Sequence, residues 1–491
     1  MSTQATSNLD LKAEQLAIAK RFCDGLKAAF EDEELNEAIE VAAKDLQEKG
    51  YAVVPGIFTA DQCTEALDKF WQVLTTASGG RIQRPRSAAD WAKFKKGGNW
   101  PSEMHGILAN GEWAHLPMVR SMRTENPRAC YVFMRLYGCQ VHELKQANDR
   151  VNFQAPAEWM PHSLKKVPKA QLGIEDASWL HCDQALLKTG RHCIQGLLTL
   201  TPATQPGDAS LELLPYSHLL HPHLESLIGR ELTPSQAKEN WLKFSDEEKQ
   251  RMNRVIRFVG DDNSEHALFD RFISVEAAAG SLVLWDSRTL HQGGSIRAHA
   301  GAPRLDPTRP RFVVYICMQP IWGGVENLAD KQRKKMQTSF EKRRATSHWP
   351  GAGSTAITVF GAPRVYAGQA QSEWHWDGLL DEAKPHEDSL ATQFFGLSTL
   401  QRPGILSRLH RKAELPTIAK GTKPLLRFHT DSGCSKKGME TTAKLDESGD
   451  LSEKQRCKRY FKWNLDASDE DEEEMAAPDA KRPKTKEDGN K

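Results

Sequence analysis

The sequence of 491 residues lacks several features that define special classes of protein. It contains no apolar run of about 18 residues, so no transmembrane helix is predicted. The opening residues MSTQATSNLDLK show no basic segment followed by an apolar core, so no secretory signal is predicted. The formal net charge is only +1. The overall charge therefore gives no indication of a nucleic-acid or membrane partner.

Cysteine is scattered and gives no metal-ribbon pattern. The nine cysteines are odd in number, and none forms a C-x-x-C pair. A disulfide framework is therefore not expected, and a reducing, intracellular compartment is the better interpretation. Within the cell, the cytoplasm and the nucleus remain open. The basic cluster from Lys481 to Lys486 is a candidate nuclear signal, and a solvated tail is the alternative interpretation.

The first sixty residues carry clear helix and strand signals. Apolar residues recur at steps of three to five over residues 9–48, which predicts a helix that Gly50 would end. Residues 51–58 form a short apolar run of strand character. Thr59 and Gln62 then fit a capping box, which predicts that another helix begins here.

The central part of the chain is typical of an all-β sandwich or barrel. Short β-rich runs separated by turn residues occur at 194–200, 209–214, 279–285 and 312–318. Residues 128–138 before these runs form an apolar helix candidate, and residues 222–258 between them look like a charged, helical insertion. The β core is therefore expected to carry flanking helices.

These patterns predict four regions. Residues 1–49 form an N-terminal helical extension, and residues 50–325 form the main β domain. Residues 326–431 form a C-terminal extension that opens with a basic helix. Residues 432–491 are polar and charged, and we expect them to be mostly disordered.

His-x-Asp pairs are the first candidate metal ligands. Alternate residues at the end of a strand point the same way, so such a pair can supply two ligands to one metal. The sequence contains four of them: His181-Cys-Asp183, His375-Trp-Asp377, His386-Glu-Asp388 and His429-Thr-Asp431. The spacing alone is therefore weak evidence.

Only the first pair is followed by further strands that carry suitable residues. One apolar strand ends at His291, and the next opens at Arg311. Two histidines and one carboxylate on one face of a metal leave positions open for other ligands, as in non-haem Fe(II) oxygenases that use O₂. The predicted iron ligands are His181, Asp183 and His291, and we predict no catalytic residue beyond them. A single histidine of this kind is more often a surface residue or a hydrogen-bonded core residue. The prediction therefore depends on the order of the candidate ligands and strands along the chain.

Arginine suits the expected co-substrate of such a site. 2-Oxoglutarate chelates iron through its keto acid end, and its far carboxylate needs a fixed cation. The fork of an arginine guanidinium can bind a carboxylate through two hydrogen bonds. Arg311 directly adjoins an apolar strand. It is therefore the preferred candidate for binding 2-oxoglutarate.

Four segments together resemble the phytanoyl-CoA dioxygenase-like family of Fe(II)/2-oxoglutarate-dependent oxygenases. They are Gly50–Phe58, Trp179–Gln184, Leu211–His218 and Gly280–His291, and the resemblance covers roughly residues 48–320. It implies a double-stranded β-helix, or jelly roll, in a mainly β core with flanking helices (α+β). It also implies the same three iron ligands, and Arg311 as the partner of the 2-oxoglutarate carboxylate.

The chain departs from the family pattern in three places. The family often has its arginine sooner after the distal histidine than Arg311, so Arg309 and Arg297 remain alternatives. Gly293 occupies a position that is commonly serine, and Tyr216 occupies one that is usually glycine. These differences allow a differently built co-substrate site.

The resemblance implies hydroxylation of a small-molecule or acyl substrate, with conversion of 2-oxoglutarate to succinate and CO₂. The presence of Asp183 favours hydroxylation over the halogenation found in relatives that lack this carboxylate. Two alternatives stay open. One is an oxygenase of nucleic acid or protein, which the charged tail suggests. The other is a jelly-roll binding protein that has lost turnover.

Several residues near the predicted site have two interpretations. Gln195 and Trp285 lie on strands near the ligands, and Trp285 either walls the pocket or belongs to the core. Residues 148–153 either line the entry or form a plain loop. Residues 346–350 form either a lid or partner surface, or a turn anchored by Trp349.

Overall fold

The computed structural model describes the parts of the chain that form the folded core and its edges. These are residues 2–87, 89–91, 106–108, 110–154, 179–205, 207–294, 309–351, 357–360, 374–380, 385–419, 422–426, 428 and 452–463. No helix within these ranges combines the length and the apolarity that crossing a bilayer requires.

The N-terminal region forms two helices, α1 (Ser2–Glu31) and α2 (Glu33–Glu48), where the sequence predicted one. Asp32 breaks the run because its side chain accepts a 2.8 Å hydrogen bond from the backbone N–H of Leu35 and so caps α2. Gly50 follows α2 with a φ of +82°, as expected of a residue that ends a helix. The prediction of a single helix was wrong only at Asp32.

The capping box at the start of the next helix is confirmed. The Thr59 side chain accepts from the Gln62 N–H, and the Gln62 side chain accepts from the Thr59 N–H. The remaining α-helices, all shorter than α2, complete the outer layer. Their bounds, with that of the capped helix, are α3 Ala60–Ala77, α5 Pro117–Thr124, α6 Pro127–Tyr137, α9 Leu224–Ile228, α10 Asp246–Val255, α11 Asp330–Glu341, α12 Leu390–Phe394, α13 Ile405–Arg411 and α14 Glu453–Tyr460.

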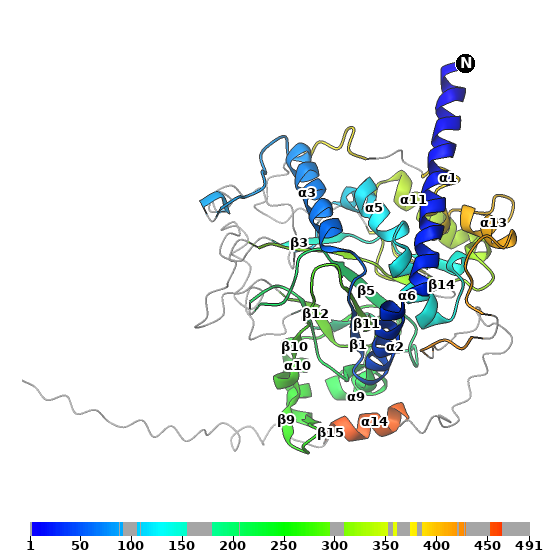
Figure 1. Cartoon of the computed structure of the whole chain (residues 1–491). Helices are drawn as coiled ribbons and strands as arrows, with labels where there is room; N and C mark the ends of the chain where they lie inside the picture. The colour runs from blue at the N-terminus through cyan, green and yellow to red at the C-terminus, as the bar shows by residue number, and fades with distance from the viewer. Residues whose placement is uncertain are drawn as a thin grey trace, which may run out of the picture.

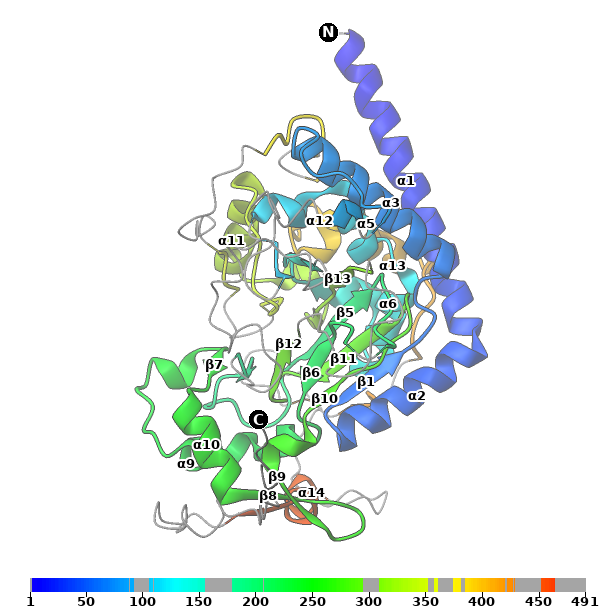
Figure 2. The same ribbon diagram turned by 90° about the vertical axis from the view of Figure 1, so that its left-hand side faces the viewer.

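Two five-stranded antiparallel sheets form the centre of the molecule (Figures 1 and 2). The major sheet has the order β1 (Tyr51–Val54), β11 (Leu282–Asp286), β5 (Ile194–Thr199), β13 (Arg311–Tyr315) and β3 (Val151–Gln154). The minor sheet has the order β10 (Ile273–Ser274), β6 (Leu211–Leu213), β12 (His291–Gly293), β4 (His181–Cys182) and β7 (Leu242–Lys243). Neighbours far apart in the sequence are hydrogen-bonded in both sheets.

Side-chain alternation divides the major sheet into two faces. Leu197, Val283 and Val313 on one face pack with Leu211 and Leu213 of the minor sheet in a single apolar cluster. The two sheets therefore face each other across a shared interior. This is the jelly roll expected from the sequence.

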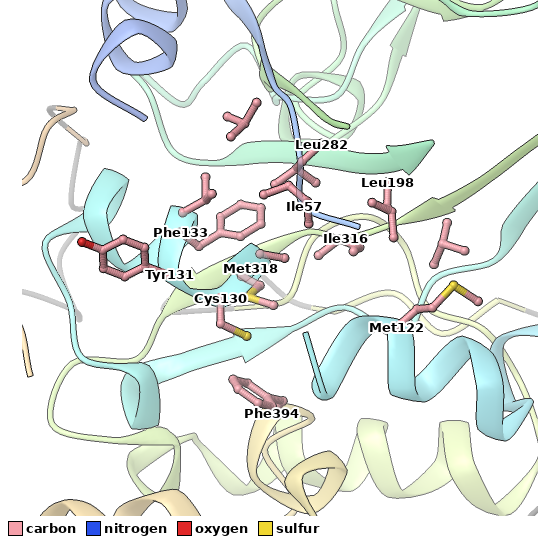
Figure 3. Packing of buried hydrophobic residues seen from close by; sticks show 14 of the residues in the cluster. Ile57, Met122, Cys130, Tyr131, Phe133, Leu198, Leu282, Ile316, Met318 and Phe394 are labelled. Carbon is pink, nitrogen blue, oxygen red and sulfur yellow. The ribbon is translucent and has the colours of Figure 1, made fainter. Parts of the chain in front are cut away.

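The other face of the major sheet packs against the helices. Leu198 of β5 and Leu282 of β11 belong to the same apolar cluster as Phe133 of α6, whose ring lies on this side of the sheet (Figure 3). The same cluster includes Ala19 in α1 and extends to Leu426 near the C-terminal end of the described core. Both terminal extensions therefore share one apolar core with the jelly roll.

Residues 452–463 are ordered, although the sequence predicted disorder over residues 432–491. They form α14 and β15 (Phe461–Trp463), and β15 pairs with β8 (Ile256–Val259), which pairs in turn with β9 (Glu265–Ala267). Cys457, Tyr460 and Phe461 are buried against this small sheet, and their apolar burial accounts for the order. The prediction of disorder is wrong for these residues, and the rest of the tail lies outside the described residues.

Two central predictions need smaller corrections. The run at 312–318 forms two strands, because the backbone leaves β13 after Tyr315 and resumes as β14 (Met318–Pro320), which pairs with β2 (Leu144–Gln146). The insertion at 222–258 carries α9 and α10 as expected. It also supplies β7, which extends the minor sheet beside β4.

Candidate metal centre

The structure brings together one of the four His-x-Asp pairs and a distant histidine. His181 opens β4, Asp183 follows it, and His291 opens β12, the neighbouring strand of the minor sheet. All three are buried, and their potential ligand atoms lie within 4.8 Å of one another. Within the described ranges, this is the group of three or more such donors that could hold a metal ion.

Hydrogen bonds fix the orientation of both imidazoles. Nδ1 of His181 lies 2.8 Å from the carbonyl oxygen of Trp179, and Nδ1 of His291 lies 2.8 Å from that of Thr289. A carbonyl oxygen only accepts, so each Nδ1 carries the proton and each Nε2 keeps its lone pair. The Nε2 atoms lie 3.7 Å and 3.4 Å from the two carboxylate oxygens of Asp183. Both lone pairs therefore lie beside the carboxylate.

The protonation states fit a divalent cation. Burial lowers the pKa of His181 to about 3, so this imidazole is neutral at neutral pH. Burial opposes ionisation of Asp183, but the neighbouring His181 and His291 outweigh burial and hold its pKa below the ordinary value. Metal binding needs an ionised carboxylate and a neutral imidazole, and Asp183 and His181 meet these requirements.

Three further contacts hold Asp183 in place. Gln195 of β5 donates a 2.8 Å hydrogen bond from Nε2 to Oδ2 of Asp183. The indole N–H of Trp349 donates a 2.6 Å bond to the Asp183 carbonyl oxygen, and the Asp183 N–H donates to Ser287. Cys182 packs into a separate apolar cluster, and burial raises its pKa to about 12. It therefore stays a thiol and supplies no ligand.

A buried charge network supports the turn that ends at His291. Asp286 accepts hydrogen bonds of 2.8 Å from Nη2 of Arg288 and 2.7 Å from Nε of Arg191. Arg288 is fully buried and also donates two 3.0 Å bonds to Glu453 of α14. The C-terminal helix is thus joined to the strand end that presents His291. The only signal of this network in the sequence is the pair of charged residues, Asp286 and Arg288, beside an apolar strand.

The inner face of the major sheet places polar groups beside the triad. Trp285 and Gln195 are paired across β11 and β5, and the Trp285 ring lies 5.4 Å from that of His291. Nε1 of Trp285 and Oε1 of Gln195 are buried and have no hydrogen-bond partner in the described part of the chain. The sequence offered two interpretations of Trp285, a core residue or a wall of the pocket. The side chain is buried and also lies beside His291, so both interpretations apply.

The candidate arginines differ in their surroundings. Arg311 opens β13 opposite Gln154, is buried, and its Nη1 has no hydrogen-bond partner among the described residues. Burial lowers its pKa, and the nearby Tyr315 and Glu212 oppose this shift. Arg309 instead forms an ion pair with Asp208, and Arg297 lies outside the described ranges. Of the two arginines described, Arg309 is engaged by Asp208, which favours Arg311 as the partner of a carboxylate.

The other His-x-Asp pairs are used elsewhere. His375 is exposed, and its backbone N–H donates to Ala77. Asp388 forms an ion pair with Arg408. The pair at 429–431 is not within the described residues. These copies explain why the spacing alone was weak evidence.

Tyr216 departs from the family pattern and shows why its position suits glycine. Its φ is +67°, in the left-handed region that a glycine adopts without strain. Its ring stacks on Tyr460 of α14 with centroids 4.0 Å apart, and its N–H donates to Lys49. Contacts to the C-terminal helix therefore accompany the unusual backbone. Gly293, the other departure, ends β12.

Comparison with known proteins identifies one matching family. A family model described as phytanoyl-CoA dioxygenase matches residues 46–304. No curated protein matches the chain. Similar solved structures include the epimerase SnoN with Fe³⁺, α-ketoglutarate and nogalamycin RO (16% identity, 58% of this chain, 85% of that chain, TM-score 0.33). Another is HygX from Streptomyces hygroscopicus with nickel and 2-oxoglutarate (12% identity, 57% of this chain, 87% of that chain, TM-score 0.31). A third is EctD from S. alaskensis with bound Fe (16% identity, 57% of this chain, 75% of that chain, TM-score 0.30). Because these TM-scores are low, the solved structures support no conclusion about this chain.

Proposed function

The chain belongs to the phytanoyl-CoA dioxygenase family, and from this premise we propose that it is an Fe(II)- and 2-oxoglutarate-dependent dioxygenase. It hydroxylates a small-molecule or acyl substrate while 2-oxoglutarate is converted to succinate and CO₂. The observation that carries the proposal is the buried triad, whose two Nε2 lone pairs lie beside one carboxylate. Three ligands of this kind leave room on iron for a co-substrate and O₂.

Each residue of the site has a distinct task in this proposal. His181, Asp183 and His291 hold Fe(II), which when bound supplies the activation of O₂ that is coupled to decarboxylation of 2-oxoglutarate. Arg311 anchors the far carboxylate of 2-oxoglutarate through its unpartnered Nη1. Gln195 and Trp349 keep the Asp183 ligand in place through the hydrogen bonds described above.

The surrounding side chains favour turnover over a purely structural role. The interior between the sheets is apolar around Leu197, Val283 and Val313, which excludes water from the reacting centre. Trp285 and Arg311 leave buried donors unpartnered among the described residues. Both residues lie on strands of the major sheet, where their donors would be available to a bound ligand.

Anaerobic spectroscopy tests the proposal. Fe(II) and 2-oxoglutarate added to the full chain should give a weak visible charge-transfer band, and His291→Ala should abolish it. His375→Ala changes a histidine of the same spacing motif away from the triad, and this control should keep the band. A wild-type protein without the band, or a His291→Ala variant that retains it, would show that the proposed site is wrong. Substrate-dependent succinate release across a metabolite panel then identifies the substrate.

A further inference from the structure

The segment Thr346–Pro350 lies beyond the family match at 46–304 but adjoins the proposed metal centre. The Trp349 indole N–H donates to the carbonyl oxygen of Asp183. The ring of His348 packs against Tyr315, with centroids 5.0 Å apart in an edge-to-face arrangement. Tyr315 belongs to the apolar cluster between the two sheets. A C-terminal segment therefore places a histidine at the edge of the interior that holds the triad.

His348 is oriented by a buried acid. Its Nδ1 forms an ion pair with Oδ2 of Asp149, which is almost fully buried, while Oδ1 of Asp149 accepts a 2.7 Å bond from the Arg150 N–H. The pairing places Nε2 on the opposite edge of the imidazole. Among the described residues no hydrogen bond occupies Nε2, and the side chain is 27% exposed. The dyad thus leaves the Nε2 N–H of His348 without an acceptor among the described residues.

Charged groups of both signs act on His348. The carboxylates of Asp149 and Asp183 favour a charged imidazole, and Arg150, which follows Asp149 in the chain, opposes it. Burial disfavours a charged imidazole, but the Asp149 carboxylate outweighs it and raises the pKa of His348 to about 9. The donor is therefore cationic at neutral pH.

An exposed aromatic side chain lies near His181. Trp241 is 47% exposed, precedes β7, and its ring lies 6.2 Å from that of His181. Large exposed aromatic side chains are common where proteins bind ligands and partners. The organic part of a substrate can pack against this ring.

We propose that His348, held by Asp149, binds an anionic group of the primary substrate, a carboxylate or a phosphate, and so orients that substrate beside the metal centre. This inference rests on the proposed function and names a substrate class for it. Arg311 is assigned to the co-substrate, which leaves the His348 donor for the primary substrate. A charge-assisted hydrogen bond to an anion is among the stronger polar contacts that a protein can form.

Matched anionic and neutral probes test the inference. Benzoate and phenyl phosphate, with benzamide and phenol as neutral counterparts, are titrated into the full chain loaded with Zn(II) and 2-oxoglutarate, and binding is followed calorimetrically. We expect at least one anion to bind more tightly than its neutral counterpart. His348→Ala should lower the affinity for that anion about tenfold and leave the affinities for the neutral probes unchanged. The inference is overturned if wild type shows no preference for anions. It is also overturned if His348→Ala keeps the preference, because the anion would then bind to the metal ion and not to His348.

Further variants separate recognition from folding. His348→Lys keeps a cation and should retain part of the anion preference, and Asp149→Asn should reduce it. His266→Ala changes a histidine in the separate β8–β9 pairing and should have no effect. The Fe(II)–2-oxoglutarate band should survive in His348→Ala. A wild type without the band contradicts the proposed function, whereas a normal band with unchanged anion binding in His348→Ala contradicts only this inference.

Discussion

The indole N–H of Trp349 donates a 2.6 Å hydrogen bond to the backbone carbonyl oxygen of Asp183, 166 residues earlier in the chain. Trp349 is buried, and Lys188 covers its ring. The jelly roll thus presents the carboxylate ligand, and a residue of the C-terminal extension holds the backbone that carries it. The proposed metal centre depends on a segment outside the matched family region of 46–304.

Replacing Trp349 with phenylalanine should weaken metal binding. The variant keeps an aromatic ring but loses the N–H that holds the Asp183 carbonyl group, and loss of such supporting bonds typically costs about 10–100-fold in metal affinity. Titration of the apoprotein with Co(II), followed by its visible spectrum, measures the change. Trp113→Phe alters another buried tryptophan, away from the triad, and should leave the affinity unchanged. Equal affinities for wild type and Trp349→Phe would mean that this bond does not support the ligand.

Arg311→Ala should raise the 2-oxoglutarate requirement more than Arg309→Ala does. Arg311 has a buried Nη1 without a partner among the described residues, whereas Arg309 forms an ion pair with Asp208. Loss of a two-bond contact with a carboxylate should raise the half-saturating concentration of 2-oxoglutarate about 10–100-fold. Anaerobic titration of the charge-transfer band measures it without turnover. Arg311→Lys keeps the charge but not the fork, so its value should be intermediate; the reverse order of the two alanine variants would reassign the anchor to Arg309.

Local sequence patterns predicted the order of the triad residues along the chain, but His291 was expected at the end of the apolar strand at 279–285. It begins β12 in the other sheet instead, because β11 ends at Asp286 and a turn follows. The strands that begin at His181 and His291 have apolar runs and turn residues beside them, and the capping box at Thr59 is a four-residue signal. Antiparallel pairing of β4 and β12 then brings the histidines together, which the order of motifs along the chain anticipated. Signals of this kind are short-range, so one sequence is enough to read them.

The supporting residues could not be predicted in the same way. Trp349 contacts Asp183 only through the tertiary fold, and His348 meets Asp149 for the same reason. Nothing in the sequence near residue 348 indicates a buried acid 199 positions earlier. Glu453 lies in a segment whose composition is polar and charged, so its role as a partner of Arg288 was hidden by its surroundings. Composition describes a segment's average and misses a few buried anchors.

The His348–Asp149 ion pair should make stability depend on pH between about 6.5 and 9. Asp149 and the more distant Asp183 favour the charged imidazole, Arg150 opposes it, and the pKa of His348 lies at about 9, above its ordinary value of 6.5. Folding therefore favours the protonated form, so the contribution is fully present below pH 6.5 and is lost as the pH rises through about 9. The difference in melting temperature between metal-free wild type and His348→Gln should shrink over this range. A difference that stays constant up to pH 10, or that grows, would contradict the assignment; Asp149→Asn should remove the dependence.

The contact between Arg288 and Glu453 should couple the C-terminal helix to the stability of the metal centre. Arg288 is fully buried between Asp286 and Glu453, in the turn that ends at His291. Glu453→Gln leaves Arg288 paired with Asp286, and the Glu453 side chain is 43% exposed, so the expected loss is only about 1 kcal/mol of unfolding free energy. Arg288→Met leaves Asp286 buried with Arg191 alone, and removing one partner of a buried pair costs about 3–5 kcal/mol.

Urea unfolding gives both free energies, and Co(II) titration should show weaker binding in Arg288→Met because His291 loses the support of its turn. Arg459→Ala removes a largely exposed ion pair with Asp261 on the same helix, and should change the stability by less than about 0.5 kcal/mol. A Glu453→Gln variant as unstable as Arg288→Met would place the main anchor in the C-terminal helix. Arg288→Met with wild-type metal affinity would show that the turn holds His291 without this network. The larger loss of stability expected for Arg288→Met than for Glu453→Gln separates the two roles of Arg288. Glu453→Gln removes only the link to the helix, whereas Arg288→Met also removes the support of the turn that ends at His291.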